Sequence, residues 1–568
     1  MYTSPIVSAL ELAFSSYPVQ VFPVLSVASR AGGGDFQCNS VLQLAGRMRV
    51  KPLDMAREIA AKLELEGVCA VTVTAPGYLN FVLDPDYVAR CANGEVGRSF
   101  ARRSDNPKSI VIDFGGPNIA KALHVGHLRS FVIGESLRRI LSAVGHTVVS
   151  DIHYGDWGLP VGKLILGIET SIAETVKAGG SPDLRWTLED LGAFYRQGNE
   201  LCKSHLAYYE KAKDNTLRLQ AGDRDMRALW KRVREISLKG IEGHISMLGA
   251  HFDTLDGESD VDSLIPDMLD DLATAGLAVE SDGALVGPVV GDDSLPPVLL
   301  RKSDGSSLYG TTDLATIVDR IAKYAPDMVV YCVDGRQDVH LKTCFILAEK
   351  ASAASVPGFS PLPKLVHAAF GTVNDASGKP YSTREGKPAL LEDLIGEAID
   401  KARQVVTDGE EDTARQVAVA ALKFADLSTD RRSGYVFDPE RMMSFTGRTG
   451  PYVQYARARI NSLLRKAAAD GYAGSGAIRL THPADRDLAL AVLGLPTAIS
   501  EAAEELQARS ICEAAYRIAV AVSRLYSDTE ILRAPGIERE GRLALLDWAG
   551  SAIEEALALL GIGVPERM

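Results

Sequence analysis

The chain has 568 residues, enough for about three or four domains, and its 46% hydrophobic and 24% charged residues are typical of a globular protein. Seven cysteines, an odd number without paired spacing, argue against a disulfide framework or a zinc ribbon, so we expect reduced thiols. No apolar stretch approaches the ~20 residues that cross a bilayer, and the first residues lack a basic start and include Glu11, which argues against a signal peptide. These features favour a cytoplasmic protein that does not contact a membrane.

Three domains are expected along the chain. Residues 1–105 alternate short helical and strand patterns, which predicts a small α+β domain, and the polar, arginine-rich segment 91–106 is typical of a linker. Residues 106–395 are expected to form a second domain, with a helical insertion at about residues 183–251, where apolar side chains recur at helical spacing. Residues 396–568 have an almost entirely helical pattern, which predicts a third, all-α domain.

The second domain begins with a strand, a loop, a helix and another strand. The apolar residues 110–112 suit a buried strand, turn residues follow at 115–118, and residues 147–149 are expected to form the next strand. At the junction of loop and helix stands the sequence His-Val-Gly-His, residues 124–127.

Two histidines three residues apart share one face of a helix, and Gly126 between them has no side chain to keep a ligand from the backbone. A helix N-terminus offers unpaired N–H groups and partial positive charge, which suits a phosphate group. The pattern therefore predicts a nucleotide site. The alternative is that two histidines stand at a helix start by chance.

A histidine pair of this form after a strand is the signature of class I aminoacyl-tRNA synthetases and related nucleotidylyltransferases. The flanking sequences PNIAKALHVGHLRS, residues 117–130, and HYGDWG, residues 153–158, are similar to arginyl-tRNA synthetases in particular, and the resemblance extends nearly to both termini. It implies an α/β fold in which a Rossmann-like doubly wound catalytic domain lies between an N-terminal α+β appended domain and an all-α C-terminal anticodon-binding domain.

The resemblance also implies the reaction of an arginine–tRNA ligase. ATP, accompanied by Mg²⁺, activates L-arginine to arginyl-adenylate, and the arginine passes to the 2′-hydroxyl of the 3′-terminal adenosine of tRNA(Arg), which must be bound before activation proceeds. We expect tRNA(Arg), L-arginine and ATP as partners, a monomer, and no dedicated metal site. The implied catalytic residues are Lys121, His124, Gly126 and His127.

The second signature of class I synthetases is a mobile loop whose two lysines reach the phosphates, and the corresponding residues 378–387 read GKPYSTREGK. Pro380 and Thr383 stand where the lysines are expected, a form that some arginyl-tRNA synthetases share. Because charge develops on the departing pyrophosphate, cations are still needed, and the resemblance gives that role to Lys121. The alternative for Lys379, Arg384 and Lys387 is a solvated loop charge. The expected ATP contacts are His124, His127, Lys379, Ser382, Thr383 and Arg384.

Residues 306–315, SSLYGTTDLA, are similar to the YxTxDxA motif of the family. Tyr309 and Asp313 are four residues apart and so share a helical face, and a carboxylate there binds a guanidinium by two coplanar hydrogen bonds. The alternative for Asp313 is a helix cap. Asp113 stands where relatives carry the longer glutamate. The arginine contacts implied by the resemblance are Asp113, Asn118, Glu258, Tyr309, Asp313 and Gln337.

Two regions are expected to contact tRNA. Residues 34–39 and 76–83 are similar to the N-terminal appended domain of the family, where Tyr78 and Asn80 match a residue pair that contacts a base. A ring can stack on a splayed base while an amide reads its edge. The alternative is that Tyr78 belongs to the core and Asn80 caps a turn.

The helical domain interleaves aromatic rings with cations at Tyr452, Gln454, Tyr455, Arg457 and Arg459, as recognition of a single-stranded loop requires. The alternative is that the rings pack in the core while the arginines face water. Although the net charge is −13, residues 421–466 hold nine Lys or Arg against four Asp or Glu, so this segment is a candidate tRNA face.

Two other functions stay open. One is a small-molecule class I nucleotidylyltransferase, which the basic helical C-terminal region argues against. The other is a non-catalytic, synthetase-like tRNA-binding paralogue, which the altered second signature favours and which the intact histidine signature and Lys121 oppose.

Overall fold

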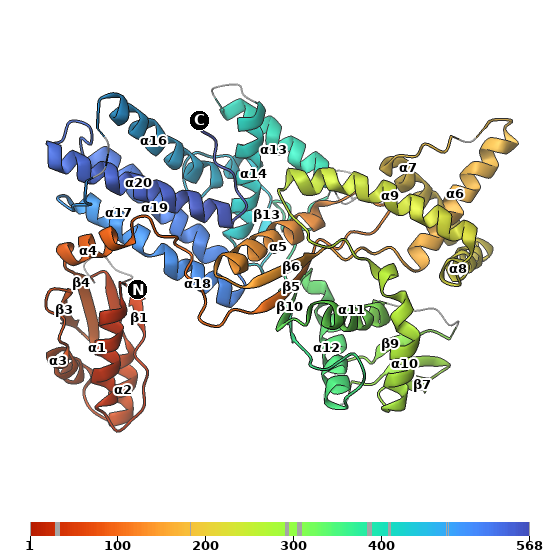
Figure 1. Ribbon diagram of the computed structural model, residues 1–568, viewed down its shortest axis with the longest axis horizontal. Coiled ribbons are helices and arrows are strands. Elements are labelled where there is room, and N and C mark those ends of the chain that lie inside the picture. The colour runs from red at the N-terminus through yellow and green to blue at the C-terminus, as the bar shows by residue number, and fades with distance from the viewer. Residues whose placement is uncertain are drawn as a thin grey trace.

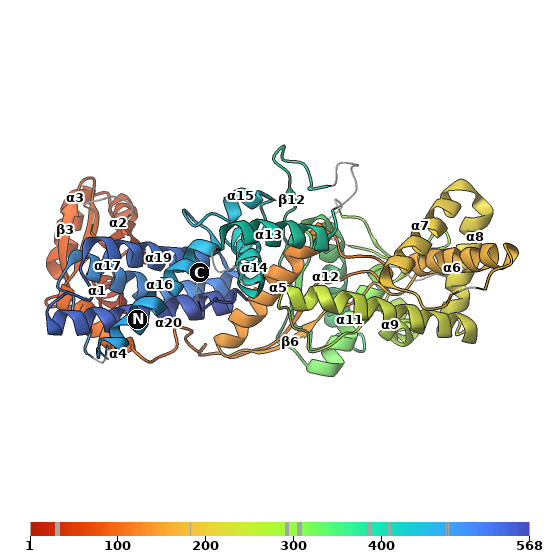
Figure 2. The same cartoon turned by 90° about the horizontal axis from the view of Figure 1, so that it is seen from above.

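Three regions succeed one another along an extended molecule in the computed structural model, which describes residues 2–28, 34–181, 183–289, 295–303, 309–382, 389–406, 411–472, 474, 476–566 and 568. The N-terminal region lies beside the C-terminal helices at one end, a sheet lies at the centre, and a group of helices projects at the other end (Figure 1). Seen from above, β3 (Cys69–Thr74) and α8 (Leu206–Gln220) mark these opposite ends (Figure 2).

The N-terminal region is a four-stranded antiparallel sheet, in the order β1-β2-β4-β3, packed against helices. On its first helix the buried residues Ile6, Leu10, Ala13 and Phe14 recur every three or four positions, so they form one apolar face. Besides β3, the elements of this region are α1 (Ser4–Ser15), β1 (Leu25–Val27), β2 (Phe36–Cys38), α2 (Ser40–Met48), α3 (Pro52–Lys62), β4 (Tyr78–Leu83) and α4 (Pro85–Glu95).

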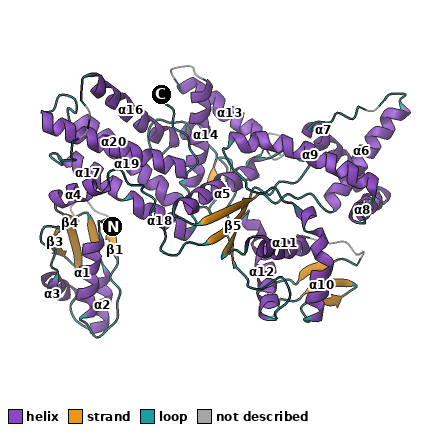
Figure 3. Cartoon of the chain, in the orientation of Figure 1, coloured by secondary structure: helices purple, strands orange, loops and turns teal. Residues whose placement is uncertain are grey.

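The central sheet has four parallel strands in the order β11-β10-β5-β6. Because side chains alternate along a strand, Ile110 and Ile112 of β5 pack into the core shared with α5, whereas Val111 packs into the core shared with α11 and α12. Helices therefore cover both faces, with the strands between them (Figure 3). The elements are β5 (Ser109–Phe114), α5 (Val125–Ala143), β6 (Thr147–Asp151), α11 (Tyr309–Tyr324), β10 (Met328–Cys332), η3 (Gly335–Gln337), α12 (Asp338–Ala353) and β11 (Lys364–His367).

Four helices form the projecting group at the end opposite the N-terminal region. Gly167 and Gly198 let two of them approach closely, because a side chain on either glycine would overlap a carbonyl oxygen of the other helix. After α9 the chain returns to the end of β6, where Thr254 pairs with Asp151 and Gly257 with Tyr154. The helices are α6 (Leu159–Lys177), α7 (Leu188–Ser204), α8 and α9 (Arg224–Met247).

A small antiparallel sheet, in the order β7-β8-β9, packs beside α11 and α12. Its residues share one hydrophobic core with α10 and with the second face of the central sheet. The elements are η1 (Glu258–Asp260), η2 (Asp262–Leu264), α10 (Ile265–Thr274), β7 (Val279–Ser281), β8 (Ala284–Gly287) and β9 (Val298–Arg301).

The C-terminal region is helical apart from two short paired strands. It is joined to the central sheet by Arg129 of α5, whose buried guanidinium donates to Asp426 of α14 at 3.1 Å. No helix of the described residues is long and apolar enough to cross a membrane. The elements are β12 (Val373–Asn374), α13 (Leu391–Val405), α14 (Glu411–Leu427), β13 (Tyr435–Val436), α15 (Pro439–Met442), α16 (Gly450–Ala469), α17 (Pro483–Leu493), α18 (Leu495–Glu505), α19 (Arg509–Asp528) and α20 (Gly536–Leu559).

The N-terminal region is held against these helices by polar side chains. Arg486 of α17 donates two hydrogen bonds to the carboxylate of Asp35 and a third, of 2.9 Å, to the carbonyl of Leu83. Asn93 of α4 exchanges two hydrogen bonds with the backbone of Ile478. The fold class expected from the sequence is confirmed: a parallel α/β centre between an N-terminal α+β region and a helical C-terminal region.

Candidate active site and nucleic-acid interface

The signature histidines cap the helix that they begin. Nδ1 of His124 accepts a hydrogen bond of 3.1 Å from the backbone N–H of Gly126, and Nδ1 of His127 accepts one of 3.1 Å from the N–H of His124. The two ring centroids are 4.0 Å apart. Because both Nδ1 atoms act as acceptors, a neutral ring carries its proton on Nε2, which is free to donate to a ligand.

Both imidazoles are uncharged at neutral pH. Burial and the neighbouring His124 lower the pKa of His127 to about 3. Burial, together with the charges of Arg336 and Lys121, also lowers the pKa of His124. The pair can thus donate hydrogen bonds to phosphate oxygens, but any cationic role belongs to other side chains.

Gly126 is required by its neighbour. A Cβ atom at this position would lie 2.8 Å from Cε1 of His124. The sequence predicts open space for a ligand beside Gly126, but the His124 ring occupies that space. The absence of a side chain at Gly126 therefore permits the reciprocal cap.

Lys121 lies in the loop before α5. Its Nζ is 4.6 Å from the ring centroid of Tyr195 on α7, a cation–π contact that ties the loop to the projecting helices. Its positive charge contributes to the lowered pKa of both histidines. Lys121 is therefore a cation beside the imidazole pair.

The residues that follow the second signature loop join the histidine segment through the backbone. The N–H of Val125 donates to the carbonyl of Ala389 at 2.9 Å, and the N–H of Leu391 donates to the carbonyl of Leu123 at 2.9 Å. At the other end of the loop, Lys379 and Ser382 are exposed. Of the remaining expected ATP contacts, Thr383 and Arg384 lie outside the described residues.

Carboxyl groups gather where the chain returns to the sheet. Glu258, at the start of η1, is buried and accepts a hydrogen bond of 3.2 Å from the N–H of Trp157. Burial, followed by the charges of Asp313 and Asp156, raises the pKa of Glu258 to about 8. A cation bound here would favour the charged form of Glu258.

Asp313 lies in the second turn of α11, so the helix-cap alternative is wrong. Its Oδ2 is 2.5 Å from Nε2 of His340 on α12, and this partner raises the pKa of His340. Tyr309 is the first residue of α11, but its side chain lies outside the described residues. Sequence reasoning did not select His340, although it stands three residues after Gln337 and faces the same cluster.

Asp113 is paired within the protein. One nitrogen of the Arg320 guanidinium, on α11, donates to Asp113 Oδ2 at 2.6 Å and to Asp151 Oδ2 at 2.5 Å, and all three residues are buried. A contact between Asp113 and a substrate stays a prediction, since this carboxylate already accepts a hydrogen bond from Arg320. Sequence reasoning missed Arg320, which lies seven residues after Asp313, two turns along the same face of α11.

Asn118 and Gln337 both follow carboxyl ends of parallel strands, where ligands bind in such sheets. The Asn118 carboxamide lies against Gly155, where a Cβ atom would overlap its oxygen. The backbone beside it is fixed by a hydrogen bond of 3.1 Å from the N–H of Gly155 to the carbonyl of Pro117. Gln337 is exposed at the end of η3.

In the N-terminal region, Asn80 is buried inside β4. Its oxygen accepts a hydrogen bond of 2.7 Å from Gln37, and its nitrogen donates one of 3.0 Å to Thr74 at the hairpin end. Tyr78 is half-buried. The Asn80 amide thus braces the hairpin in this structure, and the proposed reading of a base by the pair stays a prediction.

On α16 the expected tRNA contacts divide between interior and surface. Gln454 is buried, and its amide donates to the carbonyl of Gly563 at 2.6 Å. Tyr452 bonds to Ser523 and packs beside Tyr516. Arg457 donates to Glu554 at 2.8 Å. Of the five, Tyr455 and Arg459 line an open hollow.

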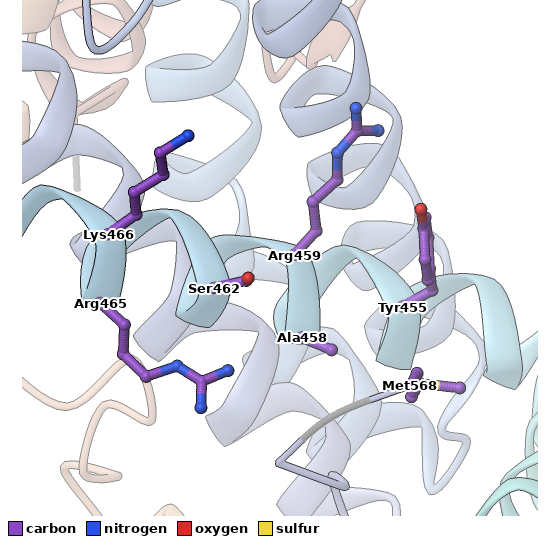
Figure 4. A pocket seen from close by; sticks show the side chains of 7 residues that line it. All are labelled: Tyr455, Ala458, Arg459, Ser462, Arg465, Lys466 and Met568. Carbon is purple, nitrogen blue, oxygen red and sulfur yellow. The ribbon is translucent and has the colours of Figure 1, made fainter. Parts of the chain in front are cut away.

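This hollow, of about 590 Å³, lies along the outer face of α16 and carries Arg465 and Lys466 as well (Figure 4). The Arg459 guanidinium lies 3.6 Å from the ring centroid of Tyr526. The cationic face is smaller than the charge count of residues 421–466 indicates, because Lys423 and Arg431 are buried. The residues that line the hollow are Tyr455, Ala458, Arg459, Ser462, Arg465, Lys466 and Met568.

Family profiles match most of the chain. The profile described as "tRNA synthetases class I (R), catalytic domain" matches residues 95–439. The "Arginyl tRNA synthetase N terminal domain" matches residues 2–83, and the "DALR anticodon binding domain" matches residues 453–568.

Known proteins resemble the chain over nearly its whole length. The arginine–tRNA ligase of Hyphomonas neptunium is 40% identical over 561 residues, 94% of each chain, and that of Maricaulis maris is 38% identical over 562 residues, 94% of this chain and 93% of its own. The Thermus thermophilus arginyl-tRNA synthetase structure superposes with a TM-score of 0.81 at 25% identity over 100% of both chains. The fold is also that of the Plasmodium falciparum enzyme, with a TM-score of 0.84 at 22% identity over 100% of this chain and 99% of the other. With a catalytic-domain profile over more than half of its length and relatives of up to 40% identity, the chain belongs to the arginyl-tRNA synthetases, a family of class I aminoacyl-tRNA synthetases.

Proposed function

We propose that the protein is an arginine–tRNA ligase, which uses ATP to attach L-arginine to the 3′-terminal adenosine of tRNA(Arg). Membership of the family supports this activity. The observation that carries it is a pair of neutral imidazoles at the start of α5, on the edge of the sheet where Glu258 and Asp313 supply carboxylates. The imidazoles suit a triphosphate, and the carboxylates suit a guanidinium.

In the first step, the carboxylate of arginine attacks the α-phosphorus of ATP in line. The new carboxylate–phosphorus bond forms as the bond to pyrophosphate breaks, and pyrophosphate leaves with the Mg²⁺ that entered with ATP. Nε2–H of His124 and His127 donates to the phosphate oxygens, and Lys121 places a cation where negative charge increases. Attack by an already ionised carboxylate needs no general base, so positioning supplies much of the remaining acceleration.

Recognition of arginine is assigned to the carboxylates beside this edge. Asp313 is held by His340 at 2.5 Å, which fixes its orientation. Glu258 is buried next to it, and a guanidinium between the two would be paired on both sides. Asn118 is assigned to the backbone end of the amino acid, and Tyr309 and Gln337 complete the set.

In the second step, the 2′-hydroxyl of the terminal adenosine attacks the arginyl carbonyl, AMP leaves with the bonding electron pair, and the hydroxyl proton passes to the departing phosphate. We assign the anticodon side of the tRNA to the hollow on α16, where exposed cations and Tyr455 lie together. The N-terminal region, through Tyr78 and its neighbours, is assigned to the outer corner of the tRNA. Arginine activation is proposed to need bound tRNA.

The anticodon-domain match over residues 453–568 argues against a nucleotidylyltransferase that acts on small molecules alone. The non-catalytic paralogue is tested by charging. With labelled L-arginine, ATP and Mg²⁺, we expect the protein to esterify tRNA(Arg), and to give no product when the terminal adenosine is removed or lysine replaces arginine. Failure to charge tRNA(Arg) would contradict the proposal and support the paralogue.

We also propose that the protein works as a monomer in the cytoplasm, where ATP and uncharged tRNA occur. All seven cysteines are unpaired, which fits a reducing compartment. Light scattering of the eluting protein should give the mass of a single chain; the mass of a dimer would contradict this assignment.

A further inference from the structure

Three side chains that commonly ligate metals meet between α11 and α12. Nε2 of His340 lies 2.5 Å from Oδ2 of Asp313 and 3.9 Å from Sγ of Cys344. One donor atom from each residue lies within 4.8 Å of the other two. His340 and Cys344 are one helical turn apart on α12, so a single helix face presents both of them.

The spacing is close to that of a tetrahedral metal site. Zn²⁺ binds nitrogen, oxygen and sulfur ligands at about 2.0–2.3 Å, which keeps neighbouring ligand atoms roughly 3.3–3.8 Å apart. The His340–Cys344 distance of 3.9 Å already suits such an ion. Asp313 and His340 need to separate by about 1 Å. The ion then takes the place of the proton between them, and the Cys344 thiol releases its proton to solvent as the sulfur binds.

The donor set selects the kind of metal. A thiolate and an imidazole favour Zn²⁺ over Mg²⁺ or Ca²⁺, which prefer oxygen ligands in larger number. Three protein ligands leave the fourth position of a tetrahedral site to water, as in catalytic zinc sites. Cys344 is buried in the hydrophobic core beside α11 and has no role in the proposed reaction, so its contact with His340 is the observation that distinguishes a metal site from substrate contacts alone.

We propose that Asp313, His340 and Cys344 form a Zn²⁺ site, and that the bound ion prevents arginine from binding by occupying the Asp313 carboxylate. The metal site rests on the three donor atoms alone, whereas competition with arginine also rests on the proposed function. Because two cations compete for one carboxylate, zinc lowers the affinity for arginine, and arginine lowers the affinity for zinc by the same factor.

The site is tested on the full-length chain, freed of metal with a chelator and returned to Mg²⁺. Titration with Co²⁺, a spectroscopic substitute for zinc, should give one tetrahedral ion per chain with a thiolate-to-cobalt charge-transfer band that excess Mg²⁺ leaves unchanged. Cys344→Ser should abolish the band and weaken binding about 100-fold or more, since loss of a partner behind the ligands already costs about 10–100-fold. Cys512→Ser is the matched control, because Cys512 is also buried within a helix. A missing band, or an equal band in Cys344→Ser, would overturn the site.

The same titration measures the competition between arginine and the metal ion, so this test does not require catalysis. L-Arginine should displace Co²⁺ from the wild-type chain, and lysine should do so far less. In zinc-inhibition assays, each protein compared with its own zinc-free rate, Cys344→Ser should need at least ten times more Zn²⁺. Cobalt that binds through Cys344 but is not displaced by arginine would overturn the proposed competition. Absence of zinc-free activity would instead contradict the proposed function, and the cobalt band would still decide the metal site.

Discussion

Each imidazole of the signature is fixed by what its Nδ1 accepts. The two hydrogen bonds of 3.1 Å from backbone N–H groups orient the rings and leave the proton of each neutral ring on Nε2, while burial and nearby groups lower the pKa of both histidines. A neutral pair donates hydrogen bonds but adds no positive charge to the departing pyrophosphate. Positive charge at the pyrophosphate must therefore come from a lysine outside the histidine pair.

Lys121 is expected to matter more than Lys379. Lys121 lies over Tyr195 close to both histidines, whereas Lys379 is exposed at the far end of its loop. We expect Lys121→Ala to lower the rate of arginine-dependent ATP–pyrophosphate exchange about 10²–10³-fold, as loss of one transition-state donor does. Lys379→Ala, the matched control, should lower it less than about tenfold. Equal losses would show that the loop, not Lys121, supplies the cation.

How far single residues can be predicted depends on where their partners lie. The helical spacing after the loop predicts His124 and His127 at the start of a helix, and the contacts that hold them there are local, since each caps a residue within three positions. Gln454 was expected on the surface, yet its partner Gly563 is 109 residues away, and no local pattern encodes that contact. Arg320 was missed for the same reason, since Asp113 precedes it by 207 residues.

At the scale of elements, α11 couples the substrate edge to the sheet. Asp313 lies in the second turn of α11. Two turns later, Arg320 links the ends of β5 and β6 by binding Asp113 and Asp151. One buried guanidinium thus binds two buried carboxyl groups, although its single positive charge balances only one negative charge, and the sheet edge depends on it. Removing one partner of a buried ion pair costs far more than removing an exposed one.

Arg320→Met is therefore expected to lower the free energy of unfolding by about 3–5 kcal/mol, because two carboxylates stay buried without a cation. Arg185→Met removes an exposed pair with Asp183 and should cost at most about 1 kcal/mol. The midpoints of thermal unfolding of the two variants measure the difference. A midpoint for Arg320→Met equal to that of Arg185→Met would contradict the role given to Arg320.

Lys423 links α14 to the C-terminal tail, since its buried Nζ donates to the carbonyl of Gly561. Burial and the charge of Arg139 lower its pKa from 10.5 to about 8, although Glu135 opposes this shift. Between these values the unfolded chain binds a proton that the folded chain does not, so stability rises with pH across this interval.

Lys423→Met removes that dependence. Relative to the variant, the wild type should gain stability from about pH 8 to pH 10.5, by on the order of 3 kcal/mol at most. Urea unfolding at a series of pH values measures the difference. A difference that stays constant, or that falls as pH rises, would contradict the lowered pKa.

In the whole molecule, the two candidate tRNA faces belong to regions that polar contacts join to each other. Arg486 bonds Asp35 and Leu83, so it fixes the N-terminal region against α17. The three-region order was predictable because each region has its own hydrophobic period. The docking was not, because Asp35 and Arg486 lie 451 residues apart.

Arg486→Gln should loosen this docking. Hydrogen bonds to a charged group contribute about 1.5–3 kcal/mol, so we expect the KM for tRNA to rise about tenfold while the KM for arginine at saturating tRNA stays the same. Steady-state charging kinetics measure both constants. Arg524→Gln, which breaks an exposed pair with Asp487 in the same helical region, serves as the control. An unchanged KM for tRNA in Arg486→Gln would show that this docking of the N-terminal region does not contribute to tRNA binding.

The most direct measurement of the central claim is arginine-dependent exchange of pyrophosphate into ATP, with and without tRNA(Arg). The account predicts exchange that requires both arginine and tRNA and that fails with lysine, because the imidazole pair and the carboxylates act on one bound pair of substrates. Exchange that ignores tRNA would contradict tRNA-dependent activation. No exchange with every substrate present would contradict the enzyme itself.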